Sequence, residues 1–272
     1  MMNLVNGAAV GVISARDRGL AYGDGVFRTF PLRGKQPVLW RRQYAKLAHD
    51  CLALGIECPA HGAFERDLAQ IAATHSDCIV KIIVTRGDSA RGYAPPAQAA
   101  CTRIVSASPL PQYLPDRAEQ GVRLHFCRLR LARQPALAGI KHLNRLESVL
   151  ARAEWNDPGI AEGILCDTGD NVICGTMSNV FVFRDGTLFT PDLTGCGVAG
   201  VMRDLVIELA AAHTVPLRVT AIGIDELLAA DEVFVVNSVI GLWPVAALTR
   251  KAWKCGPQSR RFQQWIGDAQ SR

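Results

Sequence analysis

The amino-acid sequence predicts a two-domain α+β protein. Its 272 residues exceed the roughly 100–200 residues of a typical single domain. Strand-like segments joined by short turns that contain Gly, Asn or Asp alternate with helix-like segments, which favours hairpins packed with helices over a doubly wound parallel sheet. Three prolines in residues 109–115 indicate a linker. We therefore expect a smaller N-terminal α/β domain of residues 1–108 and a larger C-terminal domain of residues 116–272.

Three segments define the expected N-terminal domain. Residues 43–54 repeat apolar side chains every three or four positions, which predicts an amphipathic helix. Residues 78–85 (CIVKIIVT) are β-branched and almost entirely apolar, as in a buried strand. Residues 102–108 (TRIVSAS) predict a second strand.

The expected C-terminal domain begins with a strand and an amphipathic helix. Residues 121–131 alternate apolar and polar side chains, which indicates a half-buried strand. Residues 142–155 predict a helix that ends before Pro158. Its inward face is expected to carry Leu143, Leu146, Val149, Leu150 and Ala153. Further strands are expected at 163–167, 172–183, 187–191, 216–221 and 232–239, and further helices at 201–213 and 224–231.

The charge pattern argues against a nucleic-acid partner. The 30 Lys and Arg residues and 25 Asp and Glu residues give a net charge of +5, and the basic residues are scattered. We interpret the excess as a solvated surface, with a sharper alternative in which a few arginines bind an anionic substrate in a pocket. No run of about 18 apolar residues and no signal-peptide pattern occurs, so neither a membrane partner nor export is expected.

The nine cysteines predict a reduced protein. Their number is odd, no C-x-x-C pair occurs, and the chain is long for a disulfide-stapled secreted domain. The spacing also lacks the pattern of a zinc site, so no metal is expected. We interpret the cysteines as small, mostly buried side chains of a cytoplasmic protein.

Lys141 is a candidate for a chemical role. It follows the apolar run Ala-Leu-Ala-Gly-Ile and opens the segment KHLNRL, where the chain is expected to enter a helix. Loss of solvent and the positive end of a helix both disfavour a charged amine, which makes a lysine a usable nucleophile. A surface lysine beside a helix is the alternative interpretation.

Two glycine-containing segments are candidates for ligand contact. Residues 197–204 (GVAGVMRD) predict a helix start whose free N–H groups can hold a phosphate, and Ser238, at a strand end, can add a hydroxyl to the same anion. An ordinary loop-to-helix turn and a plain strand-end serine are the alternatives. Residues 17–30 (DRGLAYGDGVFRTF) form a glycine-rich bend that either lines a pocket or only turns the chain.

The order of several motifs resembles one enzyme family. The series DRGLAYGDGVFRT, TRGDSARGY, KHLNRLESVLAR, EGILCD, GTMSNVF, LFTP and GVAGVMRD resembles the fold-type IV pyridoxal-phosphate enzymes over most of the chain, about residues 3–246. KHLNRL, GTMSNVF and GVAGVMR are most similar to the 4-amino-4-deoxychorismate lyases of that family. The resemblance implies a D-amino acid aminotransferase-like fold, a pyridoxal 5'-phosphate cofactor and a homodimer.

The resemblance also implies roles for individual residues. Lys141 matches the lysine that binds the cofactor covalently and then moves protons. Lys46 stands where the family usually has an arginine for the cofactor phosphate, and a lysine keeps the charge but loses the two-pronged hydrogen bonding. The family holds the phosphate through backbone N–H groups and a hydroxyl, and it has an arginine near the cofactor ring. The matching residues are Val201 and Met202, Ser238, and Arg145 respectively.

Cys174 departs from the family pattern, although its position belongs to the cofactor-binding set. A glutamate usually stands there and keeps the pyridine nitrogen of the cofactor protonated. A thiol carries no fixed negative charge at its ordinary pKa. Three interpretations stay open: Cys174 hydrogen-bonds an unprotonated nitrogen, a water or another group replaces the carboxylate, or the activity is impaired. We favour the first two together.

The resemblance implies a lyase that converts the small molecule 4-amino-4-deoxychorismate to 4-aminobenzoate and pyruvate in folate biosynthesis. That substrate carries two carboxylates, for which Arg28 and Arg91 are candidates because both lie near glycine-rich loops. Two alternatives stay open. One is an aminotransferase of the same fold acting on D- or branched-chain amino acids, and the other is a protein that binds the cofactor without catalysis.

Overall fold

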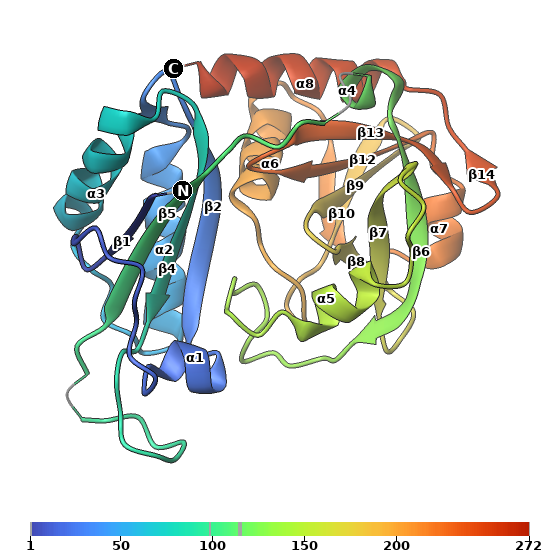
Figure 1. The fold of residues 1–272 in the computed structure, drawn as a ribbon. Helices are drawn as coiled ribbons and strands as arrows, with labels where there is room; N and C mark the ends of the chain where they lie inside the picture. The colour runs from blue at the N-terminus through green and yellow to red at the C-terminus, as the bar shows by residue number, and fades with distance from the viewer. Residues whose placement is uncertain (1, 98, 114–115, 272) are drawn as a thin grey trace. The chain divides into compact units, whose positions relative to one another are not determined.

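The structure is a computed structural model that describes residues 2–97, 99–113 and 116–271 (Figure 1). The predicted linker at residues 109–115 falls partly outside this description, because its last two residues, Leu114 and Pro115, are not among the described residues.

The chain divides into two compact units. Unit 1 is Met1–Gln112 together with Ile140–Asn144, and unit 2 is Tyr113–Gly139 together with Arg145–Arg272. The chain therefore crosses between the units three times. The short stretch that contains Lys141 belongs to unit 1, whereas the sequence had suggested that it lies within the C-terminal domain.

Unit 1 is built on a five-stranded antiparallel sheet with the strand order β1-β5-β4-β2-β3. The central strand β4 is buried along most of its length, as its β-branched, apolar sequence predicts. The strands predicted at 78–85 and 102–108 are confirmed with the same bounds. The strands of unit 1 are β1 (Met2–Val5), β2 (Gly25–Arg33), β3 (Gln36–Pro37), β4 (Cys78–Thr85) and β5 (Thr102–Ser108).

The main helices of unit 1 pack against this sheet. The second helix contacts β2 and the third contacts β5. Leu47 of the second helix and Phe64 of the third share one core cluster with Val80 of β4, because each helix turns an apolar stripe toward the sheet. The helix predicted at 43–54 is confirmed as most of the second one. The helices of unit 1 are α1 (Arg18–Tyr22), α2 (Trp40–Ala53) and α3 (His61–Thr74).

Unit 2 is built on a nine-stranded mixed sheet with the order β11-β10-β9-β12-β13-β6-β7-β8, and β14 pairs with β13 (Figure 1). Three pairs are parallel (β10 with β11, β13 with β6, and β6 with β7), and the others are antiparallel. The predicted α+β class is confirmed. The strands are β6 (Val122–Leu131), β7 (Ile160–Asp167), β8 (Val172–Gly175), β9 (Asn179–Arg184), β10 (Thr187–Pro191), β11 (Leu217–Thr220), β12 (Glu232–Asn237), β13 (Gly241–Leu248) and β14 (Lys251–Ala252).

Two longer helices of unit 2 cover β12 and β13 and contact one another. Aromatic rings contribute to this packing: the Phe181 and Phe234 rings of the sheet stack with their centroids 5.2 Å apart, and the Phe262 ring of one helix lies tilted against Phe234 with a centroid distance of 5.7 Å. The helices described in unit 2 are α4 (Arg117–Gln120), α5 (Leu146–Arg152), α6 (Val201–Ala212), α7 (Ile224–Leu228) and α8 (Pro257–Gln270), of which α6 and α8 are the two longer ones.

The helix predicted at 142–155 is wrong in length and in orientation. It begins only at Leu146, because residues 140–144 are extended and belong to unit 1. The side chains expected to face inward are outside: Leu146 is 75% exposed, Val149 59% and Leu150 60%. The helical spacing of these apolar residues is real, but within this chain the stripe has no core beneath it.

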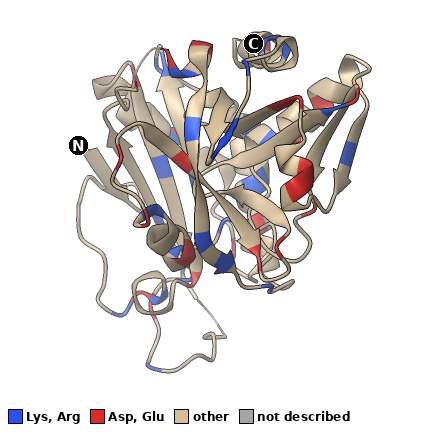
Figure 2. Cartoon of the chain, turned by 90° about the vertical axis from the view of Figure 1, so that its right-hand side faces the viewer, with Lys and Arg blue, Asp and Glu red and all other residues tan. Residues whose placement is uncertain are grey.

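Basic and acidic residues are intermixed along the elements. Figure 2 shows Lys and Arg at scattered positions on the visible strands and helices, interspersed with Asp and Glu. None of the nine cysteines, all of which lie among the described residues, forms a disulfide. Within residues 2–97, 99–113 and 116–271, no helix has the length and apolar character needed to cross a membrane.

Candidate active site

Lys141 lies in an extended segment that pairs with β2. Phe27 N donates to Lys141 O at 3.0 Å, and Leu143 N donates to Gly25 O at 2.9 Å. These bonds add residues 140–144 to the edge of the unit 1 sheet as a short antiparallel partner. The expected helix entrance at Lys141 is therefore a strand-like segment.

Two glycines allow this segment to approach β2 closely. A Cβ atom on Gly25 would lie only 2.8 Å from Leu143 Cδ1. Gly23 has a φ of +66°, and a Cβ atom there would lie 2.3 Å from Asn144 Oδ1. Only glycine meets both demands, because it has no Cβ and accepts a left-handed backbone. The glycine-rich bend at residues 17–30 thus packs against the segment that carries Lys141.

The Lys141 side chain is half-buried, and its Nζ lies 4.4 Å from the centroid of the Phe27 ring. Its backbone N–H donates to Asp50 Oδ2 at 2.9 Å. Asp50 is fully buried and also forms an ion pair with Arg28. Asp50 was not among the residues predicted for the site. It could have been noticed in the sequence as a carboxylate next to Cys51, which lies on the apolar face of the predicted helix.

The other cationic candidates of unit 1 occupy different environments. Arg28 is 2% exposed, pairs with Asp50 and donates to the Lys46 carbonyl at 3.3 Å. Lys46 is half-buried on α2, and Arg91 is exposed in the loop after β4. The Arg28 guanidinium thus faces a carboxylate of the chain itself, and its expected role in substrate binding stays a prediction.

The start of α6 supplies the anion-binding features of unit 2. Gly200 is the N-cap of this 12-residue helix, and no side chain among the described residues caps it. The first N–H groups of a helix have no partner within it, so those of Val201 and Met202 are suited to an anion. Asn179 fixes the preceding loop, because its side chain accepts from Gly200 N at 3.1 Å and donates to Val198 O at 2.8 Å.

Ser238 lies in a turn whose shape is set by its neighbour. Asn237 Oδ1 accepts from Val239 N at 2.8 Å and from Ile240 N at 2.9 Å. Asn237 Nδ2 in turn donates to Met177 O at 3.2 Å. The turn that holds Ser238 is therefore tied to the loop that follows β8, also in unit 2.

Cys174 and Arg145 lie near one another in unit 2. Cys174 is on β8 and is 8% exposed, and Arg145 is the half-buried N-cap of α5. Burial lowers the pKa of Arg145, while negative charge on Cys174 and on Glu147 would act in the opposite direction. This proximity could not be predicted from local sequence, because the two residues belong to separate elements.

Glu162 is a buried carboxylate that was also not among the residues predicted for the site. It is 1% exposed on β7 and anchors the loop after β8. Its oxygens accept from Thr176 N at 3.0 Å, Met177 N at 3.0 Å and Ser178 Oγ at 2.7 Å, and from the Thr176 hydroxyl. It could have been noticed in the sequence as the one charged side chain at the start of the EGILCD motif, ahead of the apolar residues of the same strand.

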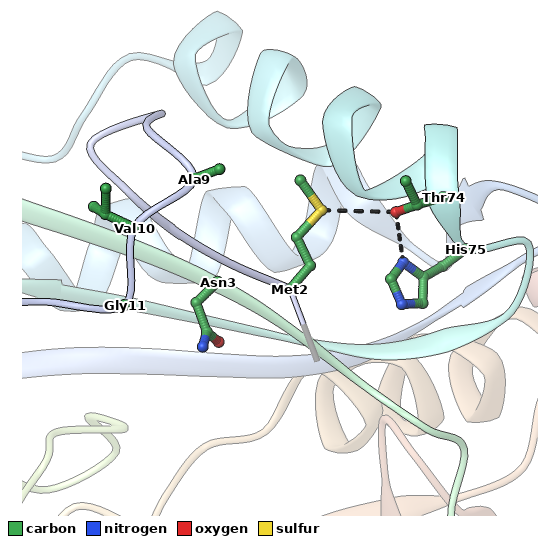
Figure 3. Close-up of a pocket in the computed structure, with 7 residues that line it drawn as sticks. All are labelled: Met2, Asn3, Ala9, Val10, Gly11, Thr74 and His75. Carbon is green, nitrogen blue, oxygen red and sulfur yellow. Dashed lines mark hydrogen bonds between the residues drawn. The ribbon is translucent and has the colours of Figure 1, made fainter.

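A surface pocket on unit 1 is not part of this set. Figure 3 shows Met2, Asn3 and Thr74 among its lining residues, with Thr74 Oγ1 hydrogen-bonded to Met2 Sδ at 3.6 Å and to His75 Nδ1 at 2.8 Å. Its lining includes neither lysine nor arginine, so it lacks the cationic groups that an anionic cofactor or substrate requires.

One group among the described residues has the atoms of a metal site. A nitrogen of His125, the sulfur of Cys127 and a carboxylate oxygen of Glu154 lie within 4.8 Å of one another in unit 2. Protein contacts already engage it: Glu154 accepts from the N–H groups of Arg128 and Leu129, and burial raises the pKa of the Cys127 thiol to about 12. Cys127 also belongs to the core cluster that contains Cys174.

The two units each hold a feature suited to one part of a phosphorylated aldehyde cofactor. The half-buried Lys141 offers an amine to an aldehyde, and the start of α6 offers N–H groups to a phosphate. The amino-transferase class IV family model matches residues 25–248. The chain belongs to this family, and the fold-type IV resemblance is confirmed.

Individual members of this family differ in how similar they are to the chain. An aminodeoxychorismate lyase from Vibrio harveyi is 34% identical over 95% of this chain and 97% of its own length. The crystal structure of 4-amino-4-deoxychorismate lyase from Pseudomonas aeruginosa is 48% identical, covers 98% of each chain and has a TM-score of 0.95. A branched-chain-amino-acid aminotransferase from Escherichia coli is 27% identical over 93% of this chain and 86% of its own length.

Proposed function

We propose that this protein is a pyridoxal 5'-phosphate-dependent lyase that converts 4-amino-4-deoxychorismate to 4-aminobenzoate and pyruvate, a step of folate biosynthesis. The observation that carries the proposal is the 48% identity, at a TM-score of 0.95, to the lyase from Pseudomonas aeruginosa. The Vibrio harveyi lyase supports it at 34% identity. The aminotransferase relative stands lower, at 27%.

The residues present fit this cofactor. Lys141 offers a half-buried primary amine for a covalent bond to an aldehyde. As the family resemblance implies, we assign the N–H groups of Val201 and Met202, the Ser238 hydroxyl and the Lys46 ammonium to the phosphate, since each is a donor suited to an anion. When bound, pyridoxal phosphate supplies the electron sink that stabilises negative charge beside the substrate amine.

In this proposal Lys141 is also the general base. Its free amine removes the proton from the ring carbon that bears the substrate amino group. The enolpyruvyl group then leaves with the electron pair of its C–O bond and is protonated to pyruvate, and the ring becomes aromatic. The Phe27 ring, 4.4 Å from Nζ, restricts where the amine can lie while it carries this proton.

We place Arg145 and Cys174 at the cofactor ring. Their mutual proximity and the low exposure of Cys174 support this assignment. A neutral thiol cannot hold the pyridine nitrogen in its protonated form as a carboxylate does. Elimination of a good leaving group makes a weaker demand on the electron sink than transamination does, so the departure at Cys174 favours the lyase.

Arg91 is the better of the two candidates for the substrate carboxylates. Its side chain is exposed, whereas the Arg28 guanidinium pairs with Asp50. An exposed guanidinium can form two parallel hydrogen bonds with an incoming carboxylate.

We also propose that the protein is a cytoplasmic homodimer. The exposed stripe of Leu146, Val149 and Leu150 on α5 supports a second copy of the chain as its cover, because an isolated soluble chain rarely exposes a contiguous apolar stripe. Size-exclusion chromatography with light scattering tests this part of the proposal.

The deciding experiment is an assay of 4-aminobenzoate formation from chorismate and glutamine with the amidating synthase. We expect 4-aminobenzoate and pyruvate in equal amounts when the wild-type protein is present, and none with Lys141→Ala. Lys35→Ala is the matched control, since Lys35 is an exposed lysine of the same unit in the turn after β2. Borohydride reduction should fix the cofactor to the peptide that contains Lys141.

The alternative activities give different results in the same assay. Turnover of branched-chain or D-amino acids with a keto acid, without 4-aminobenzoate, would assign an aminotransferase. A bound cofactor without turnover of any amine would assign a binding protein that has lost catalysis.

A further inference from the structure

Asp50 is a carboxylate buried in the apolar core of unit 1. It is 0% exposed and lies on α2 directly before Cys51, which is itself a core residue. A buried carboxylate is costly unless hydrogen bonds or opposite charge compensate it. A helix position of this kind could be filled by an apolar side chain, so the contacts that Asp50 makes indicate what the carboxylate contributes.

Three groups contact Asp50. The backbone N–H of Lys141 donates to Oδ2 at 2.9 Å, the Arg28 guanidinium pairs with the same oxygen, and His49 Nδ1 lies 3.3 Å from Oδ1. The ion pair with Arg28 has an obvious structural purpose, since it compensates the charge. The contact with Lys141 links α2 to a residue 91 positions later in the chain.

The contact with Asp50 interrupts the strand pairing at Lys141. In a regular antiparallel ladder, Phe27 and Lys141 would exchange both of their backbone hydrogen bonds. Phe27 N does donate to Lys141 O at 3.0 Å, but Lys141 N donates to Asp50. The peptide groups on either side of the Lys141 Cα are therefore held by two different elements, β2 and α2.

Adjacent residues of β2 point to opposite faces of the sheet. One of them, Phe27, contacts Lys141, and the next, Arg28, contacts Asp50. Phe27 holds the Lys141 carbonyl and lies below its Nζ. Arg28 points toward α2, where it compensates the Asp50 charge. A carboxylate alone would anchor the backbone but also place an uncompensated negative charge near the amine.

We propose that Asp50 is a positioning residue that fixes the backbone of Lys141, and that Arg28 neutralises it so that the anchor does not alter the protonation of the bound lysine. The inference rests on the function proposed for Lys141. Arg28 is thereby assigned to the support of the lysine rather than to the substrate.

The chain offers a matched control for this proposal. Asp67 on α3 is 1% exposed and pairs with Arg103 through Oδ2 at 2.5 Å, also in unit 1. The hydrogen bonds described for this pair do not involve residues 140–144. Asp67→Ala therefore removes a buried ion pair of the same kind without touching the lysine. Asp50→Asn keeps an oxygen that can accept from Lys141 N while it removes the charge.

The first experiment measures kinetics and backbone protection. Asp50→Ala should lower kcat about 100-fold with little change in KM, because misplacement of a reacting group costs about that factor. Hydrogen exchange of the apo-protein should be faster in the peptide around Lys141 than in wild type. Asp50→Asn should recover most of both losses, and Asp67→Ala should change neither.

The second experiment tests the charge compensation, through the pH midpoint of the visible absorbance of the bound cofactor. Arg28→Gln leaves the Asp50 charge in place and should raise this midpoint by about one pH unit, whereas Asp50→Asn leaves the Arg28 charge and should lower it. The double variant should return close to wild type. His49, Lys46 and Cys51 of α2 and Lys81 of β4 are further titratable groups on the elements packed around Asp50 and Lys141, and all four are unchanged in the three variants.

The outcomes separate this inference from the proposed function. Equal effects of Asp50→Ala and Asp67→Ala on kcat and on exchange would overturn the positioning role, as would midpoint shifts of the same sign for Arg28→Gln and Asp50→Asn. Failure of the proposed function would be seen in the wild type, as absence of a borohydride-stable link at Lys141. Hydrogen exchange of the apo-protein still tests, in that case, whether Asp50 holds the backbone of Lys141.

Discussion

Replacing Glu162 by Gln should destabilise unit 2 and loosen the loop after β8. The carboxylate is 1% exposed, and its two oxygens accept from the N–H groups of Thr176 and Met177 and from the Ser178 hydroxyl. An amide of the same shape replaces one acceptor oxygen by a donor. At least one loop N–H would then face another donor and lose its partner.

The magnitude follows from the number of bonds affected. A buried donor without a partner costs about 1–3 kcal/mol, and a hydrogen bond to a charged group contributes about 1.5–3 kcal/mol. The serine hydroxyl can rotate to accept from the new amide, so its bond is weakened rather than lost. We expect Glu162→Gln to lower the free energy of unfolding by about 3 kcal/mol.

The effect should also reach the residues assigned to the cofactor phosphate. Met177 O accepts from Asn237 Nδ2 at 3.2 Å, and Asn237 shapes the turn that contains Ser238. A looser loop after β8 should therefore weaken retention of the cofactor as well as stability. Hydrogen exchange should increase in peptides that cover both segments.

Urea unfolding of the apo-protein measures the stability term, and the absorbance of the dialysed holoprotein measures cofactor retention. Glu119→Gln is the control, because Glu119 is an exposed glutamate of the same unit on α4. It should change the free energy of unfolding by less than about 0.5 kcal/mol. A loss below about 1 kcal/mol for Glu162→Gln would refute the reasoning, since the hydrogen bonds would then contribute little.

Three further predictions concern the cofactor set and pH. Lys46→Ala should weaken cofactor retention far more than Lys35→Ala, and Lys46→Arg should restore it, because a guanidinium forms two charge-assisted bonds with a phosphate; equal retention in all three variants would contradict the assignment. Cys174→Glu should protonate the pyridine nitrogen, which a nitrogen-15 spectrum of labelled cofactor would show, and it should raise transamination relative to elimination. A pyridine nitrogen that is already protonated in the wild type would contradict the proposed contact between the neutral Cys174 thiol and an unprotonated nitrogen. The pKa of Glu154 is lowered from 4.5, because hydrogen bonds from Arg128 N and other groups outweigh burial; the resulting stability is present above pH 4.5 and lost as pH falls through the lower folded-state pKa, so acid unfolding of Glu154→Gln should be less steep than that of wild type.

Much of the secondary structure was determined by local sequence. The bounds of β4 follow from a continuous β-branched, apolar run, which is typical of a buried strand, and those of β5 follow from the segment TRIVSAS, which forms a half-buried strand. The start of α6 follows from Gly200 and the apolar periodicity after it. The family was evident from motifs distributed along the chain, and with it came the prediction that Lys141 forms the covalent bond. These features depend on neighbours within a few positions, which a sequence displays directly.

Tertiary structure decided where that lysine is held and by what. Periodicity alone placed residues 142–155 in one buried helix, but residues 140–144 pair with β2 and α5 begins at Leu146 with its apolar stripe exposed. Local spacing shows that a stripe exists without showing what covers it. Asp50 is 91 positions from Lys141, and the Arg28 side chain meets it across the sheet–helix interface. Such contacts arise because backbone and charged groups that are removed from water need hydrogen-bond partners. Which partner is within reach depends on the packing of segments that are distant in the sequence.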